Sequence, residues 1–423
     1  MTSRKQLKAR IRARMARTGE SYTTAHRRIA GEPRPVHDGG YSLRGGVHPP
    51  SAALANVLAH HGVDLGEPLV FGITGGPGAG YILWEFAHDD SRVVVLGFGA
   101  RWQYPDRAPL AGLERLGIPV EVRRTGGATG ATRSLRADLD DGPVIVLPDR
   151  YTLGLRHLPP KLDGRGGDLV VVHGFDGGRY HLDDRNLAPL SVPAERLEAA
   201  RARVGSYKNL ALVPRPTGPV PEEVLRRAVL AGIADCAEQL GGTSASFALP
   251  AWAKWARTVV DPRAAKGWPS VFADGRGLVG ALTSVWEGVT PAGMSGGHLR
   301  DLTADFLDDA GVVLDRDLSA AATAWRAAAQ AWRTVAEAAL PADVPEFGRI
   351  RELTASVQQT LVADGDAGDV RADAAQLWAL QAELDSAPPL SPADQAALFA
   401  DLAAALRAVY EAERAAVAEL TPR

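Results

Sequence analysis

Histidine, serine and aspartate, the side chains of nucleophilic and acid–base catalysis, gather in two glycine-rich segments of this sequence. The first segment, GGVHPPSAALANVLAHHG at 45–62, places His48 and Ser51 around two prolines at the predicted start of a helix. Backbone N–H groups at such a start stabilise an anion or an ionised nucleophile. A structural role is the stronger alternative for this segment alone, with Pro50 in the first turn and Ser51 in the cap.

The second segment, GGDLVVVHGFDGGRYHLDDR at 166–185, holds Asp168, His173 and Asp184 on a predicted hairpin. Asp168 and His173 are five residues apart, so on a regular strand their side chains point to opposite faces. A direct Asp–His dyad is therefore not expected. Pairing of His173 with a residue of the next strand stays open.

A third segment, FGITGGPGAGYILWEF at 71–86, places Gly75, Gly76, Gly78 and Tyr81 at a predicted strand–turn–strand. Glycines let a backbone turn sharply and approach a ligand closely. No Gly-Lys-Ser/Thr follows, and a strand rather than a helix comes next, so neither a phosphate-binding loop nor a dinucleotide fingerprint is predicted. A substrate-lining loop and a tight structural hairpin are equally compatible with the residues.

The elements that must position these residues divide into two regions. Residues 35–213 predict an α+β domain, because short β-branched runs bounded by Gly, Asp or Pro outnumber the helical signals. Asp176-Gly177-Gly178 is a clear hairpin turn. The predicted helices are 51–61 and 110–116, and the predicted strands are 69–73, 81–86, 92–98, 120–123, 143–147, 169–175 and 179–183.

Residues 214–423 follow the proline-rich PRPTGPVP and have helical periodicity throughout. One apolar face repeats every seven residues from 318 to 339, and another runs from 398 to 417 behind a Ser391-Pro392 start. Seven of the nine tryptophans lie in this half. Helix-on-helix core packing explains them better than an aromatic binding box does.

Residues 1–34 predict a basic helix–turn–helix-like arm with 10 Lys/Arg against 2 Asp/Glu. Such an arm suits an anionic partner or docking on the acidic remainder of the chain. A solvated arm or a contact between copies in a homo-oligomer is the simpler alternative. Nucleic acid is not expected as a partner, because nothing in the arm is suited to read bases.

Composition narrows the class of protein. The chain has 423 residues, of which 46% are hydrophobic and 23% charged, as in ordinary globular proteins. No run of eighteen apolar residues occurs, so neither a membrane span nor membrane binding is predicted. The presence of one cysteine favours a reducing, cytoplasmic setting. The single cysteine, Cys236, excludes a disulfide framework and is expected in a helical core. No metal-ligand spacing such as HExxH is present, and neither a metal nor a cofactor is predicted.

Several motifs, in order, resemble the butirosin-biosynthesis H-protein (BtrH-like) family. They are HPPSAALANVLAHHG, EPLVFGITGGPGAGYI, RWQYPD, PVEVRRTGG, GGDLVVVHGFD and AARARVGSYKN, with SGGHLRDLTADFLDDA in the helical half. The resemblance covers residues 40–340. It implies a papain-like α/β domain followed by a helical domain, and an activity in antibiotic biosynthesis. The founding member is an acyltransferase that moves a γ-glutamyl-linked aminoacyl group from an acyl carrier protein to an amine of an aminoglycoside.

This sequence departs from the family pattern at both catalytic positions. The family's cysteine nucleophile matches Pro49, and its histidine base matches Asp168. A thioester on cysteine is therefore excluded, whereas the pocket around it can persist. The residues expected to be catalytic at this pocket are Asp168, Ser51, His48 and His173. Those expected to bind substrate are Gly75, Gly76, Gly78, Tyr81, Arg101, Trp102, Tyr104, Asp149 and Asp184.

Three functions stay open at this point. The first is acyl or aminoacyl transfer from a carrier-protein thioester to a small-molecule amine without a covalent intermediate, with Asp168 as base or ammonium anchor and Ser51 as oxyanion donor. The second is a catalytically dead binding or scaffold protein on the same fold. The third is another non-covalent reaction, such as a cyclisation, in the same pocket.

Overall fold

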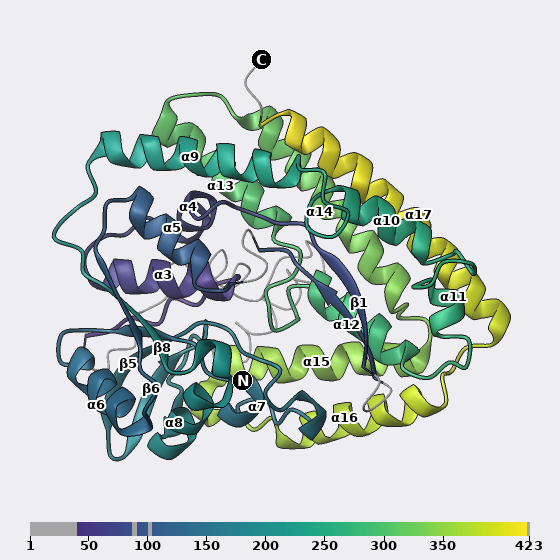
Figure 1. Ribbon diagram of the computed structural model, residues 1–423, viewed down its shortest axis with the longest axis horizontal. Coiled ribbons are helices and arrows are strands. Elements are labelled where there is room, and N and C mark those ends of the chain that lie inside the picture. The colour runs from purple at the N-terminus through teal and green to yellow at the C-terminus, as the bar shows by residue number, and fades with distance from the viewer. Residues whose placement is uncertain (1–39, 87–90, 100–103, 421–423) are drawn as a thin grey trace, which may run out of the picture. The chain divides into compact units, whose positions relative to one another are not determined.

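The computed structural model describes residues 40–86, 91–99 and 104–420, and it divides into two compact units (Figure 1). The sheet unit contains the described residues up to Thr74, then Pro105–Ala228 and Ser356–Ala375. The helical unit contains the described part of Gly75–Tyr104, then Val229–Ala355 and Gln376–Arg423. The predicted basic arm, residues 1–34, lies outside the described residues.

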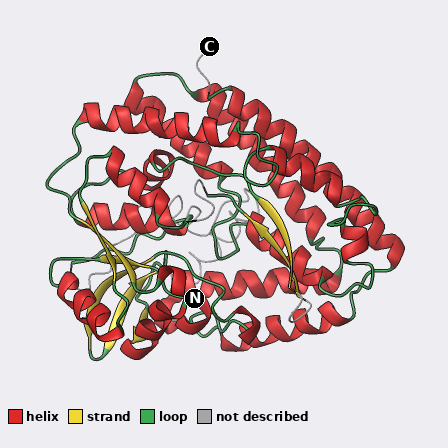
Figure 2. Ribbon diagram, viewed as in Figure 1, coloured by secondary structure: helices red, strands yellow, loops and turns green. Residues whose placement is uncertain are grey.

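A six-stranded antiparallel sheet with the strand order β3-β8-β4-β5-β6-β7 forms the sheet unit's centre (Figure 2). Valine, leucine and isoleucine dominate its middle strands, as expected for strands covered on both faces. The strands are β3 (Val120–Arg124), β4 (Val144–Val146), β5 (Val170–Asp176), β6 (Arg179–Asp183), β7 (Ser191–Pro193) and β8 (Leu210–Pro214).

Helices cover both faces of this sheet (Figure 1). Helices α6 (Ala128–Leu139) and α8 (Ala194–Arg203) pack on the face that includes Val144 and Val146. Helix α3 (Pro49–His60) packs on β4 and β5, where Ile145 is also fully buried. The remaining elements of this unit are α4 (Glu67–Ile73), α5 (Arg107–Arg115), α7 (Arg150–Leu153), and the 3-10 turns η1 (Pro160–Leu162), η2 (Gly205–Tyr207) and η3 (Gly365–Ala367).

The mixed α+β class predicted for this half is confirmed, with one wrong element. Residues 69–73 were predicted as a strand, but they belong to helix α4. A short apolar run does not distinguish strand from buried helix by periodicity. The deciding signal is Glu67-Pro68 just after Gly66, because Pro is favoured at the first helical position and an acid in the first turn.

The other predicted elements of this half are confirmed, and the hairpin is clear. Asp176 pairs with Arg179 across Gly177 and Gly178, which both have positive φ. The predicted helices 51–61 and 110–116 correspond to α3 and α5. Helices α6 and α8 and strand β7 were not predicted, since their polar or very short sequences lack a clear period. Strand β8 was also not predicted, although its sequence LALVP is apolar and buried.

The helical unit holds a two-stranded hairpin and packed helices. Strands β1 (Tyr81–Phe86) and β2 (Ser91–Leu96) pair in antiparallel register and contact α10 and α12. Trp252, Trp255, Trp268, Trp325 and Trp332 are fully buried, which supports the core-packing interpretation. The helices are α10 (Pro250–Thr258), α11 (Trp268–Val271), α12 (Leu278–Val289), α13 (Arg300–Leu314), α14 (Ser319–Ala339) and α17 (Pro392–Ala418).

Neither unit is continuous in sequence, and three helices have residues in both units. They are α9 (Glu222–Leu240), α15 (Pro345–Asp364) and α16 (Arg371–Ser386). Residues 356–375 join the sheet unit, although they follow most of the helical half. The domain boundary predicted at residues 213/214 stays a prediction. It differs from the division of the chain into the two compact units. Across the described residues, no helix combines the length and the apolar character needed to cross a bilayer.

Candidate functional site

Helix α3 begins with fewer backbone donors than an ordinary helix start. His48 is its N-cap residue, and Pro49 and Pro50 occupy the first two helical positions. Proline has no N–H, so two of the donors that a helix start normally offers are missing. Neither Pro49 nor Pro50 can therefore serve as a backbone donor to an oxyanion.

A carboxylate of the protein itself lies against this helix start. Glu67, in the first turn of α4, accepts hydrogen bonds from the Val47 N–H at 2.9 Å and the His48 N–H at 2.8 Å. The Ser51 hydroxyl lies 3.3 Å from the same carboxylate, and Glu67 is buried. The carboxyl group of Glu67 thus occupies the place where a helix start would bind an anion.

The two predicted catalytic side chains at this start contact each other; Ser51 is buried and His48 is partly exposed. His48 Nδ1 lies 3.0 Å from Ser51 Oγ, and Ser51 is only 1% exposed. Burial lowers the pKa of His48 to about 3, with Asp168 opposing this shift and Arg185 adding to it. The imidazole is therefore neutral at physiological pH, and it is a weak base for activating the serine.

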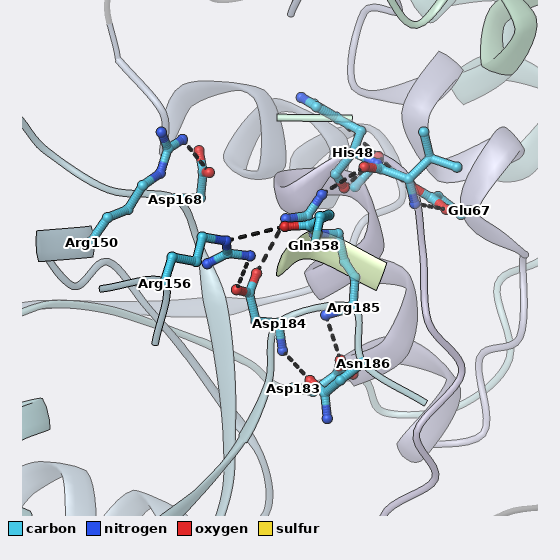
Figure 3. Close-up of polar contacts among 12 residues, drawn as sticks. His48, Glu67, Arg150, Arg156, Asp168, Asp183, Asp184, Arg185, Asn186 and Gln358 are labelled. Carbon is cyan, nitrogen blue, oxygen red and sulfur yellow. Dashed lines mark hydrogen bonds and ion pairs between the residues drawn. The ribbon is translucent and has the colours of Figure 1, made fainter. Parts of the chain in front are cut away.

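Asp168 is the accessible charge of the site, and it forms an ion pair with Arg150 (Figure 3). The two side chains are 22% and 27% exposed, respectively. Arg150 opens the short helix α7, which Asp149 caps by accepting the Thr152 N–H at 2.9 Å. Asp149 is buried and its carboxylate caps this turn, while its role as a substrate ligand stays a prediction.

A buried charge network links this region to a distant part of the chain (Figure 3). Asp184 accepts from Arg156 at 2.8 Å and from Arg185 at 3.3 Å. Arg185 also donates to the Val47 carbonyl at 2.9 Å, immediately before helix α3. Gln358 of α15 accepts from Arg156 at 3.1 Å. The predicted substrate ligand Asp184 therefore positions two arginines, one of which, Arg185, contacts the segment just before α3.

Asp183 joins a second cluster beneath the same loop. It accepts hydrogen bonds from the Tyr41 hydroxyl at 2.8 Å, Asn56 at 2.9 Å and the Arg185 N–H at 2.9 Å. Burial raises its pKa to about 6, although these hydrogen bonds act in the opposite direction. His173, predicted as a catalytic candidate, stacks on Tyr41 with ring centroids 4.5 Å apart.

The predicted glycine-rich candidates belong to the helical unit and are buried. A Cβ on Gly78 would lie 2.1 Å from the Gly99 carbonyl oxygen, so only glycine fits there. Tyr81 is 3% exposed, accepts from the Trp268 indole N–H at 2.9 Å and stacks on Trp255. These contacts favour the structural-hairpin interpretation of the segment.

The remaining predicted residues lie elsewhere. Gly75 and Gly76 are buried in the same turn, and Tyr104 is 46% exposed. Arg101 and Trp102 fall outside the described residues. Cys236 is buried next to Gly76, and burial raises its pKa to about 12, as expected of a core thiol.

The structure adds residues that were not predicted: Glu67, Arg150, Arg156, Arg185 and Gln358. Glu67 gives a signal in the sequence only as a helix-start acid, and the arginines carry none beyond their charge. Within the ranges described above, no group of three His, Cys, Asp or Glu side chains is placed to hold a metal ion. The arrangement offers an accessible pair of opposite charges, Asp168 and Arg150, beside an enclosed helix start.

Comparison with known protein families matches two regions of the chain. Residues 48–185 match the profile of butirosin biosynthesis protein H, N-terminal. Residues 195–363 match a domain of unknown function (DUF4872). A search of curated proteins finds no match to the chain. The first matched region contains every site residue from His48 to Arg185, and the second contains Gln358. By these two matches, in this order, the chain belongs to the two-domain family of proteins like butirosin biosynthesis protein H.

Proposed function

We propose that this chain serves specialised-metabolite biosynthesis by bringing an aminoacyl thioester and a small-molecule amine together without forming a covalent enzyme intermediate. The observation that carries the proposal is the partly exposed Asp168–Arg150 pair at the family's histidine position. It stands beside a helix start that has proline where the family has its nucleophile.

The opposite charges of this pair suit the reactants. The Asp168 carboxylate would hold an ammonium group and then take its proton, and Arg150 would bind an anionic group of the donor or acceptor. Because both side chains are about one quarter exposed, the ion pair can exchange partners at modest cost. His48 and Ser51 would shape the pocket wall, and neither is a nucleophile in this proposal.

The reaction balances with these groups alone. The amine nitrogen attacks the thioester carbonyl, a C–N bond forms, the C–S bond breaks, and the thiol leaves with the proton that Asp168 removes from nitrogen. A thioester is already activated and an amine is a good nucleophile, so positioning supplies much of the acceleration. No covalent bond to the protein is required.

The test combines product analysis with intact mass. Purified protein is incubated with aminoacyl thioesters on pantetheine and on an acyl carrier protein, together with a panel of amines. We expect amide above the uncatalysed rate and an unchanged protein mass. Asp168→Asn should reduce turnover by roughly 100-fold. Asp163→Asn, which removes a more exposed carboxylate paired with Arg203, is the matched control and should leave turnover unchanged.

A second candidate, a non-catalytic binding protein, is favoured by one specific observation. Glu67 occupies the helix start, so the chain lacks an oxyanion site at the position where the family performs chemistry. Measurable binding of an amine or thioester that Asp168→Asn abolishes, with no amide across the panel, would establish this candidate in place of transfer. A stable adduct on Ser51 would contradict both.

A further inference from the structure

The sheet unit contains a cavity that the proposed transfer does not use. It has a volume of about 480 Å³, within the range of small-molecule sites. Its walls come from the α7 end, strands β6 and β7, the start of α8, and residues 361–371. Both matched family regions therefore contribute to it, together with the residues just beyond the second one.

Three guanidinium groups line this cavity, and two are held in place by neighbouring groups. Arg179 donates to the Ser191 hydroxyl and to the Ser191 carbonyl, each at 2.9 Å. Arg371 donates to both carboxylate oxygens of Asp369, at 3.0 and 2.8 Å. Fixed guanidinium groups lose little entropy when they bind a ligand.

The third guanidinium, that of Arg196, is available. It lies over Gly154, where an added Cβ would be 3.1 Å from its Nη1. Throughout the part of the chain that the structure describes, Arg196 has no hydrogen-bond or ion-pair partner. His157 also lines the cavity.

The two carboxylates of the cavity are already engaged. Asp369 forms the ion pair with Arg371, and Asp366 accepts from the Ser191 N–H at 3.0 Å and its hydroxyl at 2.6 Å. The cavity lining holds three arginines and two aspartates, a net of one positive charge. Of the arginines in this lining only Arg371 forms an ion pair, so neither Arg179 nor Arg196 has a carboxylate partner there.

The wall that carries these residues is preformed. Gly365 has φ +52°, and a Cβ there would lie 2.1 Å from the Pro189 carbonyl oxygen. The Asp366 N–H donates to the same carbonyl at 2.8 Å, and the Leu187 N–H donates to Val362 O at 2.7 Å. The turn at 365–367 is thus tied by main-chain bonds to the segment that ends at Ser191.

From this geometry we propose that the cavity binds a small organic anion whose phosphate or carboxylate group pairs with Arg196. The Nη1 group of Arg179, which forms neither of the two bonds to Ser191, would supply a second donor. Phosphate and carboxylate share the planar, two-donor recognition that arginine provides, so the experiment must separate them.

The experiment titrates the full chain with inorganic phosphate and, separately, with succinate, and follows ligand NMR line widths at low salt. Binding of one anion should weaken by at least about fivefold in Arg196→Gln and less in Arg196→Lys, which keeps the charge but not the fork. Arg133→Gln removes another exposed, unpaired arginine of the sheet unit outside the cavity, and should leave binding unchanged.

Each outcome decides the proposal. The anion that binds in an Arg196-dependent way identifies the ligand group. Equal binding by the wild type and Arg196→Gln would place the anion elsewhere, for example on the basic residues 1–34, and would overturn the proposal. Lack of binding of both anions would overturn it as well. Amide-forming activity is not needed for this readout, so failure of the proposed transfer leaves the test intact.

Discussion

Both units bury charged side chains, but they enclose them to different degrees. In the helical unit, Arg300 and Glu413 are 0% exposed and form a two-point ion pair at 2.7 and 3.0 Å. In the sheet unit, Asp184 and its arginines are buried, yet the neighbouring Asp168–Arg150 pair remains about one quarter exposed.

The difference lies in how many polar atoms are satisfied within the protein. Glu413 also accepts the indole N–H groups of Trp252 and Trp332, and Arg300 also donates to the His298 and Gly78 carbonyls. No atom of that pair is left for a ligand. A fully enclosed network serves folding, whereas an accessible ion pair can exchange a protein partner for a ligand.

The strongest way to break the comparison is Glu413→Ala. It leaves the Arg300 charge buried without a counter-ion and removes the acceptor of two indoles. We expect a loss of about 3–5 kcal/mol in unfolding free energy, measured by urea denaturation with tryptophan fluorescence. Glu411→Ala breaks an exposed pair with Arg414 on the same helix and should cost less than about 0.5 kcal/mol. Similar effects of the two variants would contradict the structural role of Glu413.

Asp184→Asn is the corresponding change in the sheet unit. It removes the carboxylate shared by Arg156 and Arg185, both of which are buried, and keeps the shape of the side chain. We expect a loss of about 2–4 kcal/mol, measured by urea denaturation followed by circular dichroism. Asp163→Asn serves again as the control and should change little. A neutral Asp184→Asn would mean that the network does not hold the start of α3.

Asp183 should make the stability of the sheet unit depend on pH. Its pKa rises from an ordinary value near 4 to about 6 on folding, so the folded chain keeps a proton that the unfolded chain releases. This contribution is present below about pH 4 and is lost as the pH rises through about 6.

Comparison of the wild type with Asp183→Asn isolates this effect, because the variant cannot titrate there. Between pH 4 and pH 7, the wild type should lose about 2 kcal/mol of unfolding free energy relative to Asp183→Asn. His48 acts in the opposite direction, since its lowered pKa makes acid destabilising, but it is present in both proteins and cancels. A difference that does not vary with pH would contradict the prediction.

The smallest effect compares two helix starts. Ser391 caps α17 by accepting the Asp394 N–H at 3.2 Å, whereas α3 relies on Glu67 from another helix. Ser391→Ala should cost about 1 kcal/mol in thermal unfolding. Ser386→Ala removes an exposed hydroxyl that donates to the Ala382 carbonyl, and it should cost only a few tenths of a kcal/mol. An equal cost for both would mean that the cap adds nothing.

Local signals account for the elements that were predicted correctly. The hairpin at 176–179 follows from Asp-Gly-Gly, and the start of α17 follows from Ser391-Pro392, because both depend on neighbouring residues alone. The strand predicted at 69–73 failed because its apolar run is too short to show a period. In the helical unit, Glu413 interrupts the predicted apolar stripe of α17, and its buried role depends on Arg300, 113 residues away.

The candidate site shows the same division. The sequence by itself determined that position 49 offers neither a reactive side chain nor an N–H, because it is proline. It also indicated His48, Ser51 and Asp168 as neighbours in the family pattern. Only the tertiary structure decided that Glu67 covers the helix start, that Arg150 pairs with Asp168, and that Gln358 reaches Arg156. Charge pairing acts through space between residues up to 202 positions apart, and no local pattern of residues encodes it.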